Sequence, residues 1–293
     1  MDLQLKGKKA ILVGANGGIG RQVAHVLAEE GCDVAICGRS ADKVSATAKE
    51  CEGKGAKVYS EALDVTDASA VPALVSNAAD ALGGCDIFVS FTSANPGEDT
   101  DEAWQTILAT DVLPMRRGIE AALPHLEKSG AGSVLCISST GAVEEFMGVQ
   151  PYNALKAAVM AYSSAQSQAL APKNIRVNCI TPGPVWTEDG PWPQIKEGMP
   201  DFFGQIMGQM PLGKMTDGTE LAKAIAFVAS LGRPGRTRTS CRSKRVCMTV
   251  ASTWELEIGS EAGAPAVLDL LGEPILSRVR GSACPCWRRK TAA

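Results

Sequence analysis

Apolar and polar positions follow two rhythms over the first 230 residues of the chain. Short runs are apolar almost throughout, which is typical of strands buried on both faces of a parallel sheet. Longer segments between them carry apolar residues at the spacing of an amphipathic helix. The short runs predict strands at 9–14, 33–37, 57–63, 86–91, 133–138 and 176–181. The longer segments predict helices at 18–30, 41–53, 67–82, 102–128, 152–171 and 218–231.

The regular succession of strand and helix predicts an α/β fold. Parallel strands are joined by crossovers, and helices in right-handed crossovers cover both faces of the sheet. We therefore expect a doubly wound parallel sheet. Neither an internal linker nor a short repeat interrupts residues 1–231, so this stretch is expected to be one domain.

The composition of the 293-residue chain, 45% hydrophobic and 21% charged, is that of an ordinary globular protein. It excludes a largely disordered chain, a collagen and a coiled coil. No apolar run reaches the roughly 18 residues needed to span a bilayer, and the first run is too short for a signal peptide. We expect a cytoplasmic protein with no membrane partner. The net charge of −3 gives no reason to expect a nucleic-acid partner.

Ten cysteines are scattered through the chain without a C-x-x-C pair, and only two histidines, His25 and His125, are present. Zinc sites need clustered cysteine and histidine ligands, so no metal site is expected. Because the chain shows no secretion signal, we expect the cysteines to be reduced thiols.

Residues 232–293 form a tail that differs in composition from the rest of the chain. From residue 231 onward there are 11 Lys and Arg against 5 Asp and Glu, and arginine replaces lysine as the main base. The abrupt change supports the hypothesis of a shifted reading frame. A basic arm for nucleic acid or acidic lipid is the alternative, although the arginines lack interleaved aromatic residues. A weak strand is predicted at 246–251.

Three glycines, Gly14, Gly18 and Gly20, follow the first predicted strand and open the first predicted helix. Glycines allow a tight turn and a close approach of the backbone to a pyrophosphate, and the helix N-terminus offers free N–H groups. A flexible loop is the alternative, but the strand–turn–helix context favours a nucleotide site. Asn16 and Ile19 belong to the same turn and are further candidate cofactor-binding residues.

The spacing G-x-x-x-G-x-G resembles that of the short-chain dehydrogenase/reductase family. Tyr152 and Lys156 match its Y-x-x-x-K motif, Ser139 stands thirteen residues before Tyr152 where the family has its catalytic serine, and residues 182–187 match its P-G-x-x-x-T motif. The resemblance runs from about residue 5 to residue 230 and includes 3-oxoacyl-ACP reductase-like members. It implies a Rossmann-like fold, a nicotinamide-dependent oxidoreductase and a homodimer or homotetramer.

Tyrosine, lysine and serine in this arrangement suit the reduction of a ketone. A phenol is a weak acid at neutral pH, a neighbouring ammonium stabilises its anion, and residues four apart on a helix share a face. We therefore expect Tyr152 to be the general acid/base and Lys156 to support it. By resemblance, Lys156 also holds the nicotinamide ribose, and Ser139 orients the substrate oxygen. Asp111 stands where the family has an asparagine, and we expect it to bind a water of the proton path or Lys156.

The end of the second predicted strand indicates which cofactor is used. An acidic residue there binds the ribose 2′-OH of NAD, but this chain has Gly38 followed by Arg39 and Ser40. Arginine pairs with a 2′-phosphate, so NADP(H) is expected and NAD(H) is the less favoured alternative. The resemblance to the family implies that Asp64 and Val65 lie near the adenine. By resemblance, the other cofactor-binding candidates are Tyr152, Lys156, Pro182, Gly183, Val185 and Thr187.

Two further segments bear on the function. Residues 90–93 replace the family's N-N-A-G beside the adenosine, and Phe91 is bulky for that place. Residues 184–215 are a predicted lid rich in aromatic residues and methionine, which favours an apolar carbonyl substrate. Packing of this insert on itself is the alternative.

Together these features predict an NADP(H)-dependent oxidoreductase that interconverts a ketone and a secondary alcohol, with 1–231 as its catalytic domain. An NAD-dependent alcohol dehydrogenase of the same fold is one alternative. A nucleotide-binding sensor or scaffold with little turnover is the other. Asp111, the altered 90–93 segment and the tail favour the sensor, whereas the complete set of Ser139, Tyr152 and Lys156 argues against it.

Overall fold

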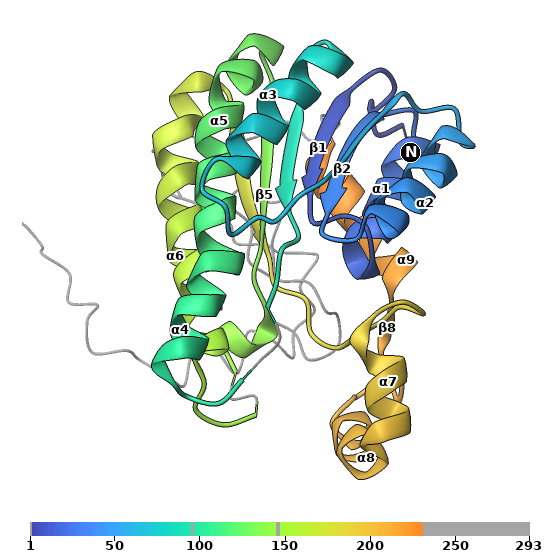
Figure 1. Cartoon of the computed structure of the whole chain (residues 1–293), viewed down its shortest axis with the longest axis vertical. Helices are drawn as coiled ribbons and strands as arrows, with labels where there is room; N and C mark the ends of the chain where they lie inside the picture. The colour runs from blue at the N-terminus through green and yellow to red at the C-terminus, as the bar shows by residue number, and fades with distance from the viewer. Residues whose placement is uncertain (1, 95–96, 145–146, 231–293) are drawn as a thin grey trace, which may run out of the picture. The chain divides into compact units, whose positions relative to one another are not determined.

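Parallel strands form the central sheet of the protein (Figure 1). The computed structural model describes residues 2–94, 97–144 and 147–230. The sheet contains β1 (Lys9–Val13), β2 (Asp33–Gly38), β3 (Val58–Ala62), β4 (Ile87–Ser90), β5 (Ser133–Ile137) and β6 (Arg176–Ile180). Their order is β3-β2-β1-β4-β5-β6, so the strand order reverses between β1 and β4. This is the order of a Rossmann fold, and the predicted doubly wound sheet is confirmed.

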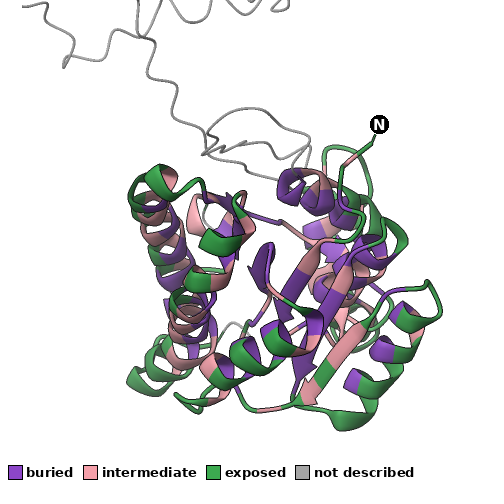
Figure 2. Ribbon diagram, turned by 90° about the horizontal axis from the view of Figure 1, so that it is seen from above, coloured by how far each residue is buried: buried purple, intermediate pink, exposed green. Residues whose placement is uncertain are grey.

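Helices cover both faces of the sheet (Figure 1). One layer contains α1 (Gly18–Glu29), α2 (Ala41–Glu52) and α9 (Gly218–Ala229), and the other contains α3 (Ala70–Leu82), α5 (Leu113–Ser129) and α6 (Pro151–Leu170). Successive strand residues point to opposite faces, so Leu12 joins the buried cluster under the first layer and Ile11 joins the second. Figure 2 shows the buried residues following the strands and the inward sides of the helices.

The predicted helix at 102–128 is divided in the structure. It consists of α4 (Asp101–Ile107), the π-helical segment η1 (Leu108–Val112) and α5. Pro114 lies in the first turn of α5 and has no backbone N–H, so it cannot donate the usual helical bond to Thr110. The regular ladder of helical hydrogen bonds is thus interrupted directly after η1. π-Helical insertions are frequent at functional sites, and this one carries Asp111.

The segment predicted as a lid forms a small structure of its own. The two-residue strands β7 (Val185–Trp186) and β8 (Thr216–Asp217) pair in parallel. Between them lie α7 (Pro191–Gly198) and α8 (Pro200–Gly208). Trp192, Ile206 and Met215 form a buried cluster that is separate from the two clusters of the sheet.

Membrane spans and metal sites can be judged for the described residues, and the tail cannot. Among the described residues, no helix is both long enough and apolar enough to cross a membrane. The same residues contain no group of three or more His, Cys, Asp or Glu placed to hold a metal ion. The tail, the strand predicted at 246–251 and the two hypotheses for the tail lie outside the described residues.

Candidate active site

The predicted site residues gather at the carboxyl ends of the strands. The glycine turn follows β1, residues 90–93 end β4 and continue beyond it, Ser139 follows β5, and Pro182 follows β6. Because the sheet is parallel, all these segments leave it at the same edge. In open α/β sheets this edge, next to the reversal of strand order, is where ligands bind.

The glycine turn has the shape that a phosphate cradle requires. Gly14 and Gly18 have φ values of 78° and 53°, in the left-handed region that favours glycine. A Cβ on Gly20 would lie 2.8 Å from the Cα of Ala15, so α1 can approach the turn this closely only with glycine. No side chain caps the N-terminus of α1, which leaves its first N–H groups available to an anion. The residues present therefore fit a nucleotide pyrophosphate.

Tyr152 and Lys156 lie on successive turns of α6, which begins at Pro151. The Lys156 side chain is only 2% exposed, and its Nζ lies 5.5 Å from the centre of the Tyr152 ring. That Nζ donates a hydrogen bond to the carbonyl oxygen of Ile137, at a distance of 3.2 Å. The hydroxyl of Ser138 donates to the backbone carbonyl of Lys156 at 2.7 Å. These contacts with the end of β5 hold the ammonium beside the phenol.

Asp111 makes a buried ion pair with Lys156. Its Oδ2 lies 2.9 Å from Nζ, and its side chain is 0% exposed. The carboxylate also accepts hydrogen bonds from the Ala94 N–H, at 2.7 Å, and from the Ser93 hydroxyl, at 3.1 Å. Of the two roles expected for Asp111, the structure shows the contact with Lys156. The same carboxylate ties the segment after β4 to the lysine of α6.

Ser139 lies at the start of the short 3-10 helix η2 (Thr140–Ala142), two residues after β5 ends. Its hydroxyl oxygen accepts a hydrogen bond from the Gly141 N–H at 3.2 Å, so the hydroxyl proton is left to donate. The Thr140 N–H donates to the carbonyl of Pro182 at 2.9 Å. Since η2 packs against α6, the serine and tyrosine segments are neighbours.

The P-G-x-x-x-T segment lies against the glycine turn. Thr187 is buried, and its Oγ1 is 3.9 Å from the position that a Cβ would take on Gly18. Its Cγ2 lies closer than 3.0 Å to the position of a Cβ on Gly218, at the start of α9. Val185 is buried in the cluster beneath α1 and α9. The structure thus brings Thr187 to the turn where a cofactor's phosphates are expected.

At the end of β2, Gly38 is buried, whereas Arg39 and Ser40 are exposed. The Ser40 hydroxyl oxygen caps α2 by accepting a hydrogen bond from the Lys43 N–H at 3.4 Å. Asp64 is exposed nearby, and hydrogen bonds from Thr66 hold the pKa of its carboxyl below the usual value. The positive charge of Arg39 lowers that pKa further. Arg39 and Asp64 therefore lie within electrostatic reach of each other.

The size of Phe91 suggests that its ring would crowd the adenosine side of the cofactor site, but the ring packs inward. Its ring packs against the buried cluster under α1 and α9, and its Cγ lies 3.2 Å from where a Cβ on Gly20 would be. The adjacent Ser90 and Thr92 hydroxyls lie 3.2 Å apart and share a hydrogen bond. The bulky residue of the 90–93 segment is therefore part of the core beneath the glycine turn.

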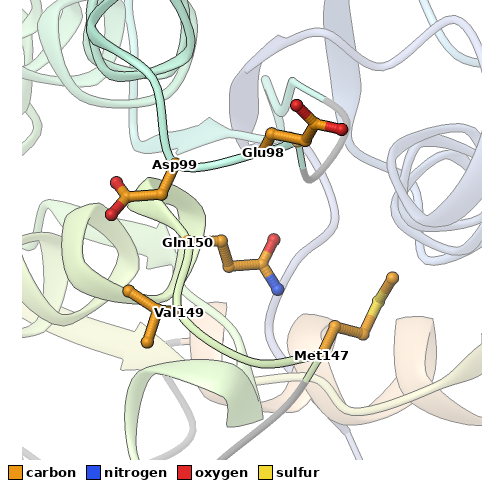
Figure 3. Close-up of a pocket in the computed structure, with 6 residues that line it drawn as sticks. Glu98, Asp99, Met147, Val149 and Gln150 are labelled. Carbon is orange, nitrogen blue, oxygen red and sulfur yellow. The ribbon is translucent and has the colours of Figure 1, made fainter.

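A cavity of about 340 Å³ lies between the segment after β4 and the segment before α6 (Figure 3). Gln150, two residues before Tyr152, extends into it, whereas the Asp99 carboxylate points away and accepts a hydrogen bond from Trp104 Nε1 at 2.9 Å. The lining residues are Gly97, Glu98, Asp99, Met147, Val149 and Gln150. Sequence reasoning missed all of them, because they lie in loops without a motif. Only the nearness of Gln150 to Tyr152 could have indicated one.

The aromatic residues of the lid pack mainly on one another. Trp186 and Trp192 make edge contacts with Phe203, with ring centres 6.3 and 6.4 Å apart. Phe202, Met207 and Met210 pack against the same cluster, whereas Met199 is exposed. This arrangement supports the alternative in which the insert packs on itself, so its composition alone does not define the substrate.

Comparisons with known proteins show the family to which the chain belongs. The model of the short chain dehydrogenase family matches residues 8–190. The chain is 36% identical over 188 residues to dehydrogenase/reductase SDR family member 4 of Sus scrofa, covering 62% of this chain and 67% of that protein. It is 30% identical over 231 residues to the isoepoxydon dehydrogenase of Penicillium expansum, covering 77% and 89% respectively.

Solved structures give the same result. The L-sorbose reductase of Gluconobacter frateurii, complexed with NADPH and L-sorbose, has a TM-score of 0.72 and 29% identity, covering 79% of this chain and 92% of that one. An actinorhodin polyketide ketoreductase with NADPH has a TM-score of 0.70 and 26% identity, covering 77% and 91%. The family match extends over more than half of the chain, and the chain therefore belongs to the short chain dehydrogenase family of oxidoreductases.

Proposed function

We propose that the protein is an NADP(H)-dependent oxidoreductase that interconverts a ketone and a secondary alcohol. The observation that carries the proposal is the buried Lys156 ammonium beside the ring of Tyr152, at the strand edge that also holds the glycine turn. A protein that only binds a nucleotide has no need of a buried ammonium next to a phenol. The ketoreductase and the sorbose reductase, which are described with NADPH, support the proposal by similarity.

In this mechanism Tyr152 moves the proton. Its hydroxyl gives a proton to the carbonyl oxygen during reduction and takes one from the alcohol during oxidation. Lys156 stabilises the phenolate formed in between, since an opposite charge nearby favours an ionised group. Ser139 donates its hydroxyl proton to the substrate oxygen and fixes its direction. NADP(H), when bound, supplies or accepts the hydride.

The preference for NADP(H) rests on the residues after β2. Gly38 offers no carboxylate to a ribose hydroxyl, and the exposed guanidinium of Arg39 is free to meet a 2′-phosphate. The N-terminus of α2, which begins directly after Ser40, adds a favourable helix dipole for an anion. The alternative preference for NAD has no carboxylate at this strand end to support it.

Location, assembly and substrate class are also proposals. We propose a cytoplasmic homo-oligomer whose subunits meet through the helices at 102–128 and 152–171. Trp104 and Leu108, on the first of these, are 41% and 39% exposed, which suits a contact surface. For the substrate we propose a small apolar carbonyl compound or the corresponding alcohol. Met147 and Val149 of the cavity in Figure 3 support an apolar group, whereas its other lining side chains, Glu98, Asp99 and Gln150, are polar.

Titration of the purified full-length protein with NADPH and, separately, with NADH tests the proposal. Energy transfer from tryptophan to the nicotinamide reports binding. We expect tighter binding of NADPH, followed by NADPH oxidation when carbonyl compounds are screened. Tighter binding of NADH would contradict the cofactor assignment. Binding of neither nucleotide would refute the reductase function, and binding without turnover of any ketone or alcohol would favour the sensor.

A further inference from the structure

Gly38 and Asn16 occupy the same space at the end of β2. Gly38 is buried, and a Cβ placed on it would come closer than 3.0 Å to Cγ, Oδ1 and Nδ2 of Asn16. Real Cβ atoms do not approach other heavy atoms so closely. The amide group of Asn16 therefore lies where any side chain at position 38 would begin.

The turn that carries Asn16 has little freedom to retreat. The N–H of the preceding Ala15 donates a hydrogen bond of 3.0 Å to the carbonyl of Cys37, the residue before Gly38. Ala15 is also buried, and its Cα is in close contact with the helix at Gly20. The backbone of the turn is thus tied both to the end of β2 and to α1. A side chain at position 38 must displace the Asn16 side chain rather than shift the turn.

Position 38 is also where dinucleotide-binding folds place the acid that selects NAD. We propose that Asn16 is a specificity-determining residue, because it occupies the space that this acid needs and so couples the choice of residue 38 to residue 16. The inference rests on the proposed nucleotide site and deepens it. Arg39, which is exposed one residue further on, supplies charge for a 2′-phosphate but does not compete for this space.

Because of this coupling, a change of cofactor preference needs two substitutions. Gly38→Asp alone introduces the carboxylate, and its Cβ requires the Asn16 amide, which is the end of a flexible side chain, to leave the place that it holds in the structure. Asn16→Ala removes Cγ, Oδ1 and Nδ2, which are the atoms that a Cβ on Gly38 would meet. The double variant therefore has both the acid and the space. Arg39→Asp, by contrast, shifts the preference towards NAD mainly by weakening NADPH binding.

The experiment compares four full-length proteins: the wild type, Asn16→Ala, Gly38→Asp and the double variant. Dissociation constants for NADH and NADPH come from tryptophan energy transfer, and melting temperatures are measured without nucleotide. We expect Gly38→Asp to melt at a lower temperature than the double variant, because only the single variant must displace the Asn16 amide. We also expect the double variant to bind NADH about tenfold more tightly than Gly38→Asp does, and to bind NADPH more weakly than the wild type does.

The two readouts separate this inference from the proposed function. The inference is wrong if Gly38→Asp has the same melting temperature as the double variant and binds NADH equally well. Asn16 would then move aside freely. If the double variant, and the same variant with Gly at position 16, bind NADH no better than Gly38→Asp, the inference is also overturned. A further outcome is that Gly38→Asp melts at a lower temperature than the double variant while the wild type binds neither nucleotide. In that case the contact between Asn16 and residue 38 is confirmed, but the proposed function and the specificity role of Asn16 are both wrong.

Discussion

At the scale of the residue, the Asp111 carboxylate is the charged partner of the Lys156 ammonium. A carboxylate has only acceptor oxygens, and three donors converge on it: the Lys156 ammonium, the Ser93 hydroxyl and the Ala94 N–H. An asparagine would replace one of these oxygens with an NH₂ group, which is a donor. If the amide oxygen of the asparagine keeps the hydrogen bond from the Ala94 N–H, its NH₂ group faces the Lys156 ammonium. The contact between Asp111 and Lys156 therefore depends on the carboxylate rather than on a side chain of this shape alone.

Asp111→Asn should weaken both the fold and the activity. Removing one partner of a buried ion pair leaves an uncompensated charge, which costs about 3–5 kcal/mol of unfolding free energy. We expect a lower melting temperature and a fall in turnover of roughly tenfold or more. Ser93→Ala is the matched control, because it removes one neutral donor from the same carboxylate at a cost of about 1 kcal/mol. Turnover and melting temperature equal to the wild type would show that the charge of Asp111 is not needed.

Tyr152→Phe should abolish turnover and leave nucleotide binding nearly unchanged. Loss of a general acid/base lowers the rate by about 10²–10⁴-fold. Tyr162→Phe, on the same helix, is the control; its hydroxyl accepts a hydrogen bond from Gln166 and has no part in the site. Steady-state kinetics of the two variants, with NADPH titrations, make the comparison. Turnover equal to that of the wild type in Tyr152→Phe would show that Tyr152 is not the general acid/base.

The residue types of the site could be predicted from the sequence, and the contacts between them could not. The motifs indicated Ser139, Tyr152 and Lys156 because those residues recur at set spacings. The pairing of Asp111 with Lys156 depends on how η1 and α6 pack, and spacing along the chain carries no information about it. The contact between Asn16 and Gly38 escaped for the same reason, since it joins two different loops.

At the scale of the element, helical periodicity predicted where helices lie but not how regular they are. The segment at 102–128 has helical spacing throughout, yet it includes the π-helical η1. Periodicity reports which residues face the core and carries no information about the hydrogen-bond pattern of the backbone. A proline near the middle of a long predicted helix was the available signal.

Glycines inside helices should respond oppositely to alanine, according to what each one touches. A Cβ on Gly118 in α5 would come closer than 3.0 Å to the ring of Phe88 on β4, whereas a Cβ on Gly204 in α8 would meet nothing within 4 Å. We expect Gly118→Ala to destabilise the protein by about 1–3 kcal/mol, despite the better helix propensity of alanine. Gly204→Ala should stabilise it by up to about 1 kcal/mol. Denaturant unfolding gives the change in unfolding free energy for both variants. Changes of the same sign would contradict the packing described for Gly118 and Gly204.

At the scale of the whole molecule, the alternation of strands and helices was enough to predict the sheet. The strand order β3-β2-β1-β4-β5-β6 came only from the structure, because right-handed crossovers allow more than one order in a doubly wound sheet. The cavity before α6 did not follow from the sequence, because its lining comes from loops whose course depends on the packed elements. The lid at 184–215 stays a prediction, and only the structure shows that the aromatic residues of this segment pack on one another.

Cysteines on both sides of the sheet report on the integrity of the whole fold. All six cysteines of the described residues are buried. Burial raises the pKa of Cys32 to about 12 and that of Cys37, Cys51 and Cys179 to about 11. Thiolates, not thiols, react with iodoacetamide, so these residues should stay unlabelled at pH 8 in the folded protein. Peptide mass mapping before and after unfolding checks this; rapid labelling of any of the six in the native state would contradict it.

The same pKa shifts predict a loss of stability at alkaline pH. A thiol whose pKa is near 9 when unfolded and about 11 when folded binds its proton more tightly in the native state. Its contribution to stability is complete below pH 9 and is lost as the pH rises towards 11 and 12. Unfolding free energies measured from pH 8 to 11 should therefore decline. Cys37→Ser and Cys179→Ser should each flatten the decline, and an unchanged slope in both would assign it to other groups.

The separate buried cluster of the lid has a consequence for how such an enzyme can change. Trp192, Ile206 and Met215 stabilise one another without belonging to either cluster of the sheet. Substitutions there spare the packing that holds the glycine turn, Tyr152 and Lys156 in place. The part of the segment from α7 to Met215 can therefore change in sequence without disturbing that packing, whereas Val185 and Thr187 of the same segment cannot, because they pack against the sheet cluster and the glycine turn.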